Sequence, residues 1–270
     1  MTDAPPETPT VIAIASGKGG VGKTWFAITL AQALARRGLR VLLFDGDLGL
    51  ANVDVQLGLT PTHDLGAVLS RSVPLTRAVT RHEAGGFDVL AGRSGSGALA
   101  ALDPAALDST LAGLRAQATG YDVVLLDLGA GVERAVRRMA ASADTLLVLA
   151  TDEPTSLTDA YAVLKLFHTD RPDGDARLVI NQATTRAAGE RTYATLLRAC
   201  VTFLRREPKL AGIIRRDDRV RDAIRRQTPL LTRHPTCPAA LDVEATAETL
   251  ILPSAQSPRA PSPRSGSEAA

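Results

Sequence analysis

The sequence predicts a single α/β domain in which a mostly parallel, twisted β-sheet is covered by helices on both faces. Short runs of Val, Leu, Ile and Ala alternate with longer segments in which apolar residues recur at helical spacing. This alternation is typical of parallel sheets, because their strands are buried on both faces and their crossover connections are helices. A glycine-rich stretch between the first apolar run and the first helical segment adds a place where such a sheet can bind phosphate.

The expected strands are apolar runs bounded by glycine or polar residues, and the expected helices fill the intervals between them. The strands cover residues 11–15, 41–44, 87–90, 121–126, 145–150, 177–180 and 210–214. The helices cover residues 25–37, 64–71, 104–119, a segment that ends near 141, and residues 156–168, 188–206, 217–226 and 238–251. Asp103 is expected to cap the helix that starts at Pro104, because Asp is a preferred N-cap and proline is favoured in the first turn.

The two ends of the chain differ in composition from the part between them. Residues 1–10 are acidic and proline-rich, and residues 253–270 are rich in proline and serine without hydrophobic periodicity. We expect both ends to be disordered and residues 11–252 to form the folded domain. The first residues lack the basic and apolar regions of a signal peptide, and no run approaches the roughly 20 apolar residues of a membrane span. Cys200 and Cys237 have no metal or redox spacing, which predicts reduced thiols in a cytoplasmic protein.

The stretch GKGGVGKT, residues 17–24, matches the phosphate-binding pattern G-x-x-x-x-G-K-[ST]. It follows an expected strand and precedes an expected helix, which is the context that makes a P-loop NTPase domain. The glycines let N–H groups approach an anion, and the helix N-terminus adds partial positive charge. Lys23 is expected to reach the β- and γ-phosphates and the Thr24 hydroxyl to bind Mg²⁺; without a ligand, the stretch is a glycine-rich turn. The residues expected to contact the nucleotide here are Gly17, Lys18, Gly19, Gly20, Val21, Gly22, Lys23, Thr24 and Trp25.

A polar residue directly follows each of two other expected strands. Asp127 follows the run YDVVLL, which would bring its carboxylate beside Thr24 across the sheet. One carboxylate and one hydroxyl are sufficient for Mg²⁺, since this ion keeps several water ligands. Gly129 has no Cβ, so its N–H can approach the γ-phosphate, and Asn181 can both donate to and accept from an adenine edge. In the alternative, Asp127 only caps the next helix and Asn181 is a loop or capping residue.

The loop carries a second lysine, Lys18, directly after its first glycine. The pattern KGGVGKT resembles the deviant Walker A ATPases of the MinD/ParA class. Residues 127–131, DLGAG, resemble their switch II segment, with Leu128 in place of a small hydroxyl residue. The resemblance implies a slow, partner-stimulated, Mg²⁺-dependent ATPase that forms a homodimer around bound ATP. In that dimer Lys18 reaches the phosphates held by the partner subunit; otherwise it is a solvated loop cation.

The same resemblance implies roles for further residues. Asp47 orients the attacking water and Asp45 supports the metal shell; orientation is favoured because an Asp of ordinary pKa is a weak base. Glu153 aligns with a residue near the ribose. Asp217 matches the adenine-loop motif G-x-I-P-x-D, in which Arg215 replaces the proline. In the alternative, Asp45 and Asp47 are turn residues and Glu153 is a loop or capping residue.

Two further stretches of sequence resemble one subgroup of this class. DGDLGLANVDVQLGL at residues 45–59 and EPTSLTDAYAVLKL at residues 153–166 look like the flagellar number regulators FlhG, FleN and YlxH. This implies a cytoplasmic ATPase whose ATP-bound dimer sits at the inner face of the cell membrane and controls the number or placement of flagella. The partners known for the group are the SRP-like GTPase FlhF, flagellar switch proteins and a transcription activator. Residues 1–10 lack the DQAxxLR motif that stimulates FlhF, and residues 253–270 lack an apolar helical face for the membrane.

A basic region leaves a second function open. Residues 205–226 contain nine Lys or Arg and four Asp or Glu. Such a region is a solvated helical face with i,i+4 ion pairs, a contact for an acidic partner or lipid headgroup, or a site for nonspecific DNA. The last reading would make the chain a ParA-like partition ATPase. A metabolic enzyme that transfers a phosphoryl group is a third possibility, but no acceptor-binding cluster of carboxylates or histidines is evident in the sequence.

Overall fold

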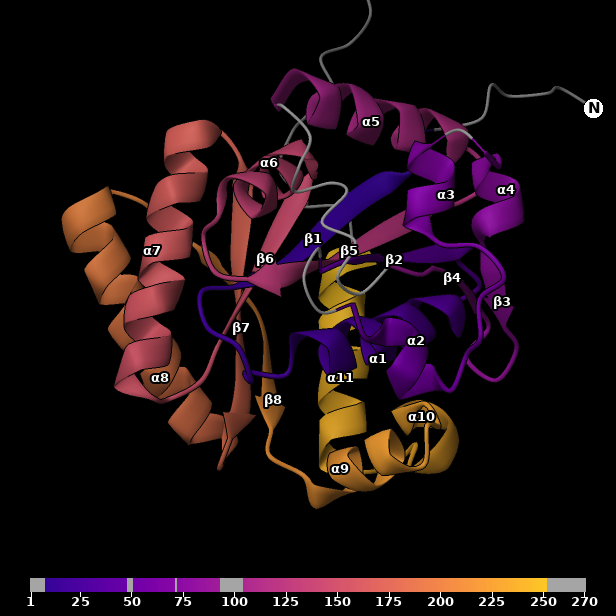
Figure 1. Ribbon diagram of the computed structural model, residues 1–270. Helices are drawn as coiled ribbons and strands as arrows, with labels where there is room; N and C mark the ends of the chain where they lie inside the picture. The colour runs from indigo at the N-terminus through magenta and orange to yellow at the C-terminus, as the bar shows by residue number, and fades with distance from the viewer. Residues whose placement is uncertain (1–7, 48–50, 71, 93–103, 252–270) are drawn as a thin grey trace, which may run out of the picture.

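The computed structural model describes residues 8–47, 51–70, 72–92 and 104–251, and these residues form an α/β fold around one eight-stranded sheet (Figure 1). The strands are β1 (Thr10–Ser16), β2 (Val41–Gly46), β3 (Thr80–His82), β4 (Phe87–Leu90), β5 (Val123–Ala130), β6 (Thr145–Ala150), β7 (Asp175–Ala183) and β8 (Lys209–Arg215). The central strands β1, β2, β5 and β6 are buried along almost their whole length, as expected where helices cover both faces. The strand order is β3-β4-β2-β5-β1-β6-β7-β8, and every neighbouring pair is parallel except β3 with β4. The predicted fold class is therefore confirmed.

Helices cover the two faces of the sheet. One face carries the first and last helices together with three short ones: α1 (Lys23–Ala35), α2 (Val53–Leu57), α9 (Asp218–Arg225), α10 (Leu230–Arg233) and α11 (Pro238–Ile251). The other face carries α3 (Leu65–Leu69), α4 (Leu75–Ala78), α5 (Pro104–Gln117), α6 (Arg134–Ser142), α7 (Pro154–Asp170) and α8 (Arg186–Ala199). Figure 1 shows α11 and α1 on the side of the sheet opposite α5, α6 and α7.

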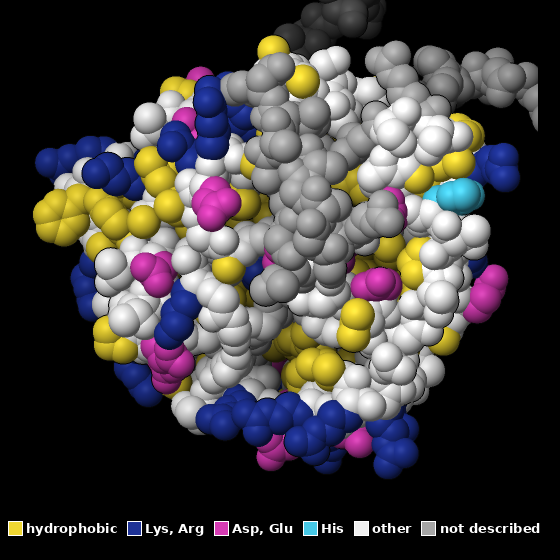
Figure 2. All heavy atoms as spheres, in the orientation of Figure 1, with side chains coloured by type: hydrophobic (Ala, Val, Ile, Leu, Met, Phe, Trp, Pro, Cys, Tyr) yellow, Lys and Arg dark blue, Asp and Glu magenta, His cyan; other side chains and the backbone are white. Residues whose placement is uncertain are grey.

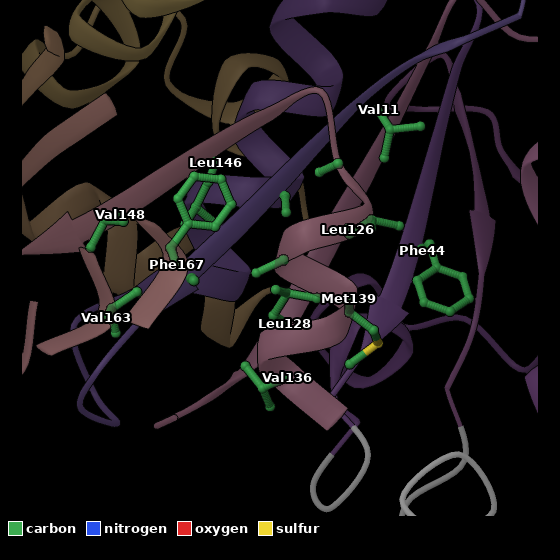
Figure 3. Packing of buried hydrophobic residues seen from close by; sticks show 14 of the residues in the cluster. Val11, Phe44, Leu126, Leu128, Val136, Met139, Leu146, Val148, Val163 and Phe167 are labelled. Carbon is green, nitrogen blue, oxygen red and sulfur yellow. The ribbon is translucent and has the colours of Figure 1, made fainter. Parts of the chain in front are cut away.

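The sheet divides the hydrophobic core into two clusters, because alternate side chains of each strand point to opposite faces. Figure 3 shows part of the cluster beneath α6 and α7, where Leu126 and Leu128 of β5 lie near Met139 and Phe167. The second cluster packs Phe26 and its neighbours in α1 against β1, β2 and α11. Because the central strands contact helices on both faces, their positions are fixed, and so are the polar residues near their carboxyl ends.

Most predicted elements are present, but the chain departs from the prediction where elements are short. The helices α2, α4 and α10 and the antiparallel edge strand β3 were not expected, since each has only three to five residues and offers too little periodicity to recognise. β5 was predicted to end before Asp127. It continues to Ala130 instead, with Asp127 paired in register with Ile14 of β1 and Asp45 of β2.

The helix predicted over 188–206 is the second departure. α8 ends at Ala199 and is followed by the π-helix η1 (Cys200–Leu204), which ends at Arg205 with φ 57°. Asp103, predicted as an N-cap, lies outside the described residues, as do residues 1–7 and 252–270, which include most of the two predicted disordered ends. Cys200 and Cys237 are both buried and free. In the described part of the chain, no helix is long and apolar enough to cross a membrane.

Candidate nucleotide-binding site

The glycine-rich stretch forms the connection between β1 and α1. Gly20 and Gly22 have φ values of 80° and 90°, a conformation that side chains with a Cβ rarely adopt. Gly17 needs its glycine for another reason: a Cβ there would lie 2.4 Å from the carbonyl oxygen of Asp159 in α7. The Ser16 hydroxyl donates to the carbonyl oxygen of Lys18 at 2.7 Å. The loop is therefore shaped by backbone geometry and by contact with α7.

Lys23, Thr24 and Asp127 meet where β5 passes the start of α1. Lys23 is 9% exposed and Asp127 only 1%. Burial raises the pKa of Asp127 to about 7, against the opposing effects of the Lys23 ammonium and of a hydrogen bond with the Thr24 side chain. Asp127 Oδ1 has no hydrogen-bond partner among the described residues. The predicted juxtaposition of Asp127 and Thr24 is present.

These atoms fit a magnesium ion in a nucleotide site. Mg²⁺ prefers oxygen ligands and binds through one or two carboxylates, with waters and substrate phosphates completing its shell. The unpaired Oδ1 of Asp127 and the Thr24 hydroxyl supply that set of oxygens. Among the described residues, no group of three or more His, Cys, Asp or Glu side chains is placed to hold a metal.

Asp45 closes the adjacent strand and holds the backbone that follows it. Its carboxylate accepts hydrogen bonds from the N–H groups of Asp47, Asn52 and Val53 at 2.9–3.2 Å. Burial raises its pKa to about 6, although these three hydrogen bonds lower it. In this arrangement Asp45 binds the backbone at Asp47, Asn52 and Val53, and its support of a metal shell stays a prediction.

Asp47 and Gly129 face each other across the neighbouring strand ends. A Cβ built on Gly129 would lie 3.4 Å from Asp47 Oδ1. Asp47, which directly follows β2, and Gly129 of β5 therefore lie close together. They are the residues expected to orient water and to contact the γ-phosphate. Their catalytic roles stay predictions.

The second lysine of the loop is held by its own chain. Lys18 Nζ donates to Glu153 Oε2 at 2.5 Å and to Thr155 Oγ1 at 3.2 Å, at the start of α7. Glu153 was expected near the ribose, but here it contacts Lys18. Its side chain remains 59% exposed and that of Lys18 40%, so the pair lies at the surface.

A cavity of about 300 Å³ lies beside the loop, on the side of β7 and β8. Asn181 borders it; its Nδ2 donates to the Val21 carbonyl at 2.7 Å, and its Oδ1 accepts from the Gln182 N–H at 2.9 Å. Asp217 also borders it and caps α9 by accepting from the Arg219 N–H at 3.0 Å. The cavity is lined by Gly20, Gly22, Trp25, Asn181, Gln182, Arg215, Arg216, Asp217, Asp218, Val220, Arg221 and Ile224.

The predictions from sequence missed Gln182 and the partner of Arg215. Gln182 has φ 58°, and its Nε2 donates to the Gly20 carbonyl at 3.4 Å; no local pattern indicates either feature. Arg215 binds the Asp242 carboxylate of α11 through both Nε and Nη2, at 2.8 and 2.9 Å, and its own N–H donates to the same carboxylate at 2.9 Å. Arg215, which replaces the expected proline, therefore connects the end of β8 to α11 through these hydrogen bonds.

The basic region over 205–226 divides into two groups. Three cations precede or begin β8, whereas the others lie at its carboxyl end, around the cavity. In the second group Arg215, Arg219 and Arg226 pair with Asp242, Asp217 and Asp222. Figure 2 shows Lys and Arg side chains along the lower edge of the molecule, over α9 and α10. Of these three pairs, only Arg226 with Asp222 has the i,i+4 spacing expected for a solvated helical face.

The fold and the loop define a P-loop nucleotide-binding protein with its site at the carboxyl ends of the central strands. The model of the CobQ/CobB/MinD/ParA nucleotide binding domain matches residues 12–230, and the chain belongs to this family. It is 37% identical to the antiactivator FleN of Pseudomonas aeruginosa over 238 residues, which are 88% of this chain and 85% of FleN.

Two further comparisons agree with this assignment. The flagellum site-determining protein YlxH of Helicobacter pylori is 29% identical over 187 residues, 69% of this chain and 63% of YlxH. The MinC:MinD cell division protein complex of Aquifex aeolicus contains a chain that superposes with a TM-score of 0.74 at 28% identity, covering 89% of this chain and 95% of that one. The predicted resemblance to MinD/ParA-type ATPases of the FleN and YlxH kind is confirmed.

Proposed function

We propose that the chain is an ATP-hydrolysing molecular switch that forms an ATP-bound sandwich dimer and regulates flagellar number or placement. The observation that carries the proposal is the buried carboxylate of Asp127, which lies against Lys23 and Thr24 with one oxygen unpaired. A buried carboxylate without a full set of partners is costly, and bound Mg²⁺ would relieve that cost. The family membership and the relatives FleN and YlxH support the flagellar part.

In the proposed mechanism, the loop N–H groups and Lys23 would hold the phosphates, and Thr24 and Asp127 would hold Mg²⁺. When bound, this ion neutralises the charge that develops on the phosphate oxygens. Asp47 accepts a hydrogen bond from the attacking water and orients it, while the Gly129 N–H faces the γ-phosphate. Most of the catalysis is then positioning and electrostatic stabilisation, as in other phosphoryl transfers.

Lys18 gives the switch its dimeric state. In the dimer it leaves Glu153 and reaches the phosphates of the partner's ATP, so the nucleotide joins the two halves. Hydrolysis removes the γ-phosphate and with it the contact that holds the dimer. The test is size-exclusion chromatography with light scattering on wild type, Asp47→Ala and Lys18→Ala, each with ADP and with ATP. Asp47→Ala with ATP is expected to be a stable dimer and Lys18→Ala a monomer; monomers under all conditions refute the sandwich.

Hydrolysis is tested separately by phosphate release with and without Mg²⁺. We expect the wild type to turn over slowly, and Asp47→Ala to be about 100-fold slower, because the attacking water loses the carboxylate that orients it. Removal of Mg²⁺ by a chelator should abolish turnover. Equal rates in wild type and Asp47→Ala would exclude the assigned role of Asp47.

The flagellar output is tested by expression in a Pseudomonas aeruginosa strain that lacks FleN. We expect the wild-type chain to restore the normal number of flagella per cell, counted by electron microscopy. Cells that express Lys23→Ala should keep the number seen in the strain without FleN. The partners expected from the resemblance are an FlhF-like GTPase, flagellar switch proteins or a transcription activator, with peripheral contact to the membrane. Co-purification with each of them, with ATP and with ADP, identifies the one that acts.

A ParA-like partition ATPase is the second candidate. It is favoured by Arg216, Arg221 and Arg225, which have no carboxylate within ion-pair distance among the described residues and lie at the same edge as the cavity. Nonspecific DNA binding through these residues would depend on ATP and weaken steeply with salt. No retention of DNA at low salt excludes this candidate.

A further inference from the structure

The π-helix η1 exposes an aromatic side chain at the surface. Phe203 is 74% exposed and Val201 37%, and Thr202 between them is exposed as well. The segment is held at both ends, because Cys200 is fully buried and Leu204 packs against the hydrophobic core. Single π-helical turns are rare and occur frequently at functional sites. Phe203 therefore projects from a base that packing holds in place.

Four cations surround these apolar side chains. All are exposed: Arg198 at the end of α8, Arg205 and Arg206 directly after η1, and Lys209 at the start of β8. None of the four has a carboxylate within ion-pair distance in the part of the chain that the structure describes. In Figure 2, hydrophobic side chains project beside Lys and Arg at the left edge of the molecule, beyond α7. The η1 patch consists of these two apolar and four basic side chains: Arg198, Val201, Phe203, Arg205, Arg206 and Lys209.

The composition of the η1 patch fits an anionic lipid surface. Peripheral proteins bind such a surface by placing apolar side chains at the boundary between headgroups and acyl chains, while Lys and Arg stay among the headgroups. Clusters of about four to eight basic residues are typical of contact with anionic lipid. The core of a protein–protein interface, in contrast, is depleted of charged residues, whereas cations flank Phe203 and Val201 directly. The charge and the exposed aromatic ring thus favour lipid over a protein partner.

The η1 patch lies at the opposite end of the strands from the phosphate-binding loop. The loop follows the carboxyl end of β1, whereas η1 precedes the amino end of β8. The strands β1, β6, β7 and β8 are successive neighbours and all run parallel. Contact with a membrane at η1 therefore leaves the nucleotide end of the molecule free for the proposed dimer.

We propose that the η1 patch binds an anionic lipid bilayer, with Phe203 at the boundary between headgroups and acyl chains and the four cations among the headgroup phosphates. The inference deepens the proposed function, because it assigns a surface to the peripheral membrane contact. The patch contains no residue of the nucleotide site, so lipid binding and the nucleotide switch can be measured separately.

The test is sedimentation of the full chain with vesicles in the presence of ADP, so that all variants are compared without the proposed dimer. The vesicles contain phosphatidylcholine alone or mixed with phosphatidylglycerol, and we expect the wild type to bind only the mixed ones. Phe203→Ser should weaken this binding about tenfold, since a large apolar side chain no longer leaves water. Arg205→Gln combined with Arg206→Gln should weaken it about 25-fold, or about fivefold for each cation.

Leu241→Ser is the matched control. Leu241 is 48% exposed and lies in α11, a helix without Lys or Arg. This variant should bind the mixed vesicles as tightly as the wild type, because an exposed apolar side chain without neighbouring cations does not form the site. Weaker binding by Leu241→Ser than by Phe203→Ser would place the contact on α11 and overturn the inference.

A second measurement locates the side chain in the bilayer. Phe203→Trp should bind mixed vesicles like the wild type, and lipids with brominated acyl chains should quench its emission. The native Trp25 is 7% exposed, and the wild type gives its contribution to the signal. Emission of Phe203→Trp that is not quenched beyond the wild-type background overturns the inference.

Three further outcomes count against the η1 patch as a lipid site. Absence of wild-type binding to the mixed vesicles overturns the inference, and so does equal binding by the wild type and Phe203→Ser, since the contact would then be electrostatic alone. Retention on duplex DNA but not on vesicles would make the patch a nucleic-acid surface instead. The proposed switch is judged independently by ATP-dependent dimerisation: a wild type that binds the vesicles but never dimerises refutes the switch and keeps the lipid site.

Discussion

Lys18 and Glu153 form an ion pair beside the phosphate-binding loop, with 2.5 Å between Nζ and Oε2. The lysine that the dimer model assigns to the partner's nucleotide is therefore held within its own subunit. Both side chains are well exposed, and exposed ion pairs contribute only about 0–1 kcal/mol. The pair keeps Lys18 near the start of α7, and breaking it costs little free energy.

Replacement of Glu153 by Gln should favour the dimer. Because the pair must break before Lys18 reaches the other subunit, Glu153→Gln should tighten ATP-dependent dimerisation of the Asp47→Ala background by up to about fivefold. Analytical ultracentrifugation at several protein concentrations measures this Kd. The control is Asp152→Asn, which removes the neighbouring exposed charge without the contact to Lys18. Equal shifts in the two variants would mean that net charge, not the pair, is responsible.

The two buried carboxylates predict a pH dependence of stability for the nucleotide-free protein. The pKa is raised from 3.8 to about 7 for Asp127 and to about 6 for Asp45, in both cases chiefly by burial. Between these values and 3.8 the folded state binds more protons than the unfolded state, so the free energy of unfolding contributed by these groups falls as pH rises. The stabilisation that comes from protonated Asp127 and Asp45 is fully present below about pH 3.8 and fully lost above about pH 7.

Asp127→Asn isolates this contribution. The variant should be more stable than the wild type by up to about 4 kcal/mol at pH 8 without Mg²⁺, and the difference should vanish near pH 4. Urea unfolding at pH 4–8 gives the values. Burial lowers the pKa of His82 and His168, and these groups act in the opposite direction, so the comparison is between the two proteins at each pH. A constant difference across this range would contradict the prediction.

Two glycines of the loop should respond differently to alanine. A Cβ on Gly17 would meet the backbone of Asp159 at 2.4 Å, whereas a Cβ on Gly19 has no atom within 4 Å. Gly17→Ala is therefore expected to cost about 1–3 kcal/mol, the usual range for overpacking, and to loosen the contact of the loop with α7. Gly19→Ala should change stability by less than about 0.5 kcal/mol. Urea unfolding measures the free energy of unfolding of both variants. Equal decreases in the two would show that the space near α7 does not limit the residue at position 17.

Arg215 should be poorly replaced by lysine. Asp242 is 7% exposed, and it accepts two side-chain hydrogen bonds from the guanidinium. A lysine cannot reproduce this geometry. We expect Arg215→Lys to lower the free energy of unfolding by about 1 kcal/mol and Arg215→Ala by about 2–3 kcal/mol, since a buried charge loses its partner. Arg219→Lys is the control, because its partner Asp217 is 3.9 Å away; a similar loss there would contradict the assignment.

The parts of the molecule that could be predicted are those that local sequence determines. The glycine-rich loop, Asp127 and the seven long strands follow from residue patterns within about ten positions. The contacts that were missed join distant residues: 135 positions separate Lys18 from Glu153, and 160 separate Val21 from Asn181. No local pattern encodes such a contact, because it depends on the order of the strands. The π-helix η1 at Cys200–Leu204 was missed for a different reason, since its residues fit an α-helix equally well.

The position of α1 has a consequence for synthesis of the chain. This helix bears Lys23 and Thr24, and eleven of its thirteen residues are buried. Its cover includes α11, which ends at Ile251, and Arg37 just beyond it donates to the Glu244 carbonyl and pairs with Glu248. β1 likewise lies between β5 and β6. In the order of translation, the nucleotide loop and α1 precede α11 by about 200 residues, so we expect the loop to gain its full packing support only after α11 has been synthesised.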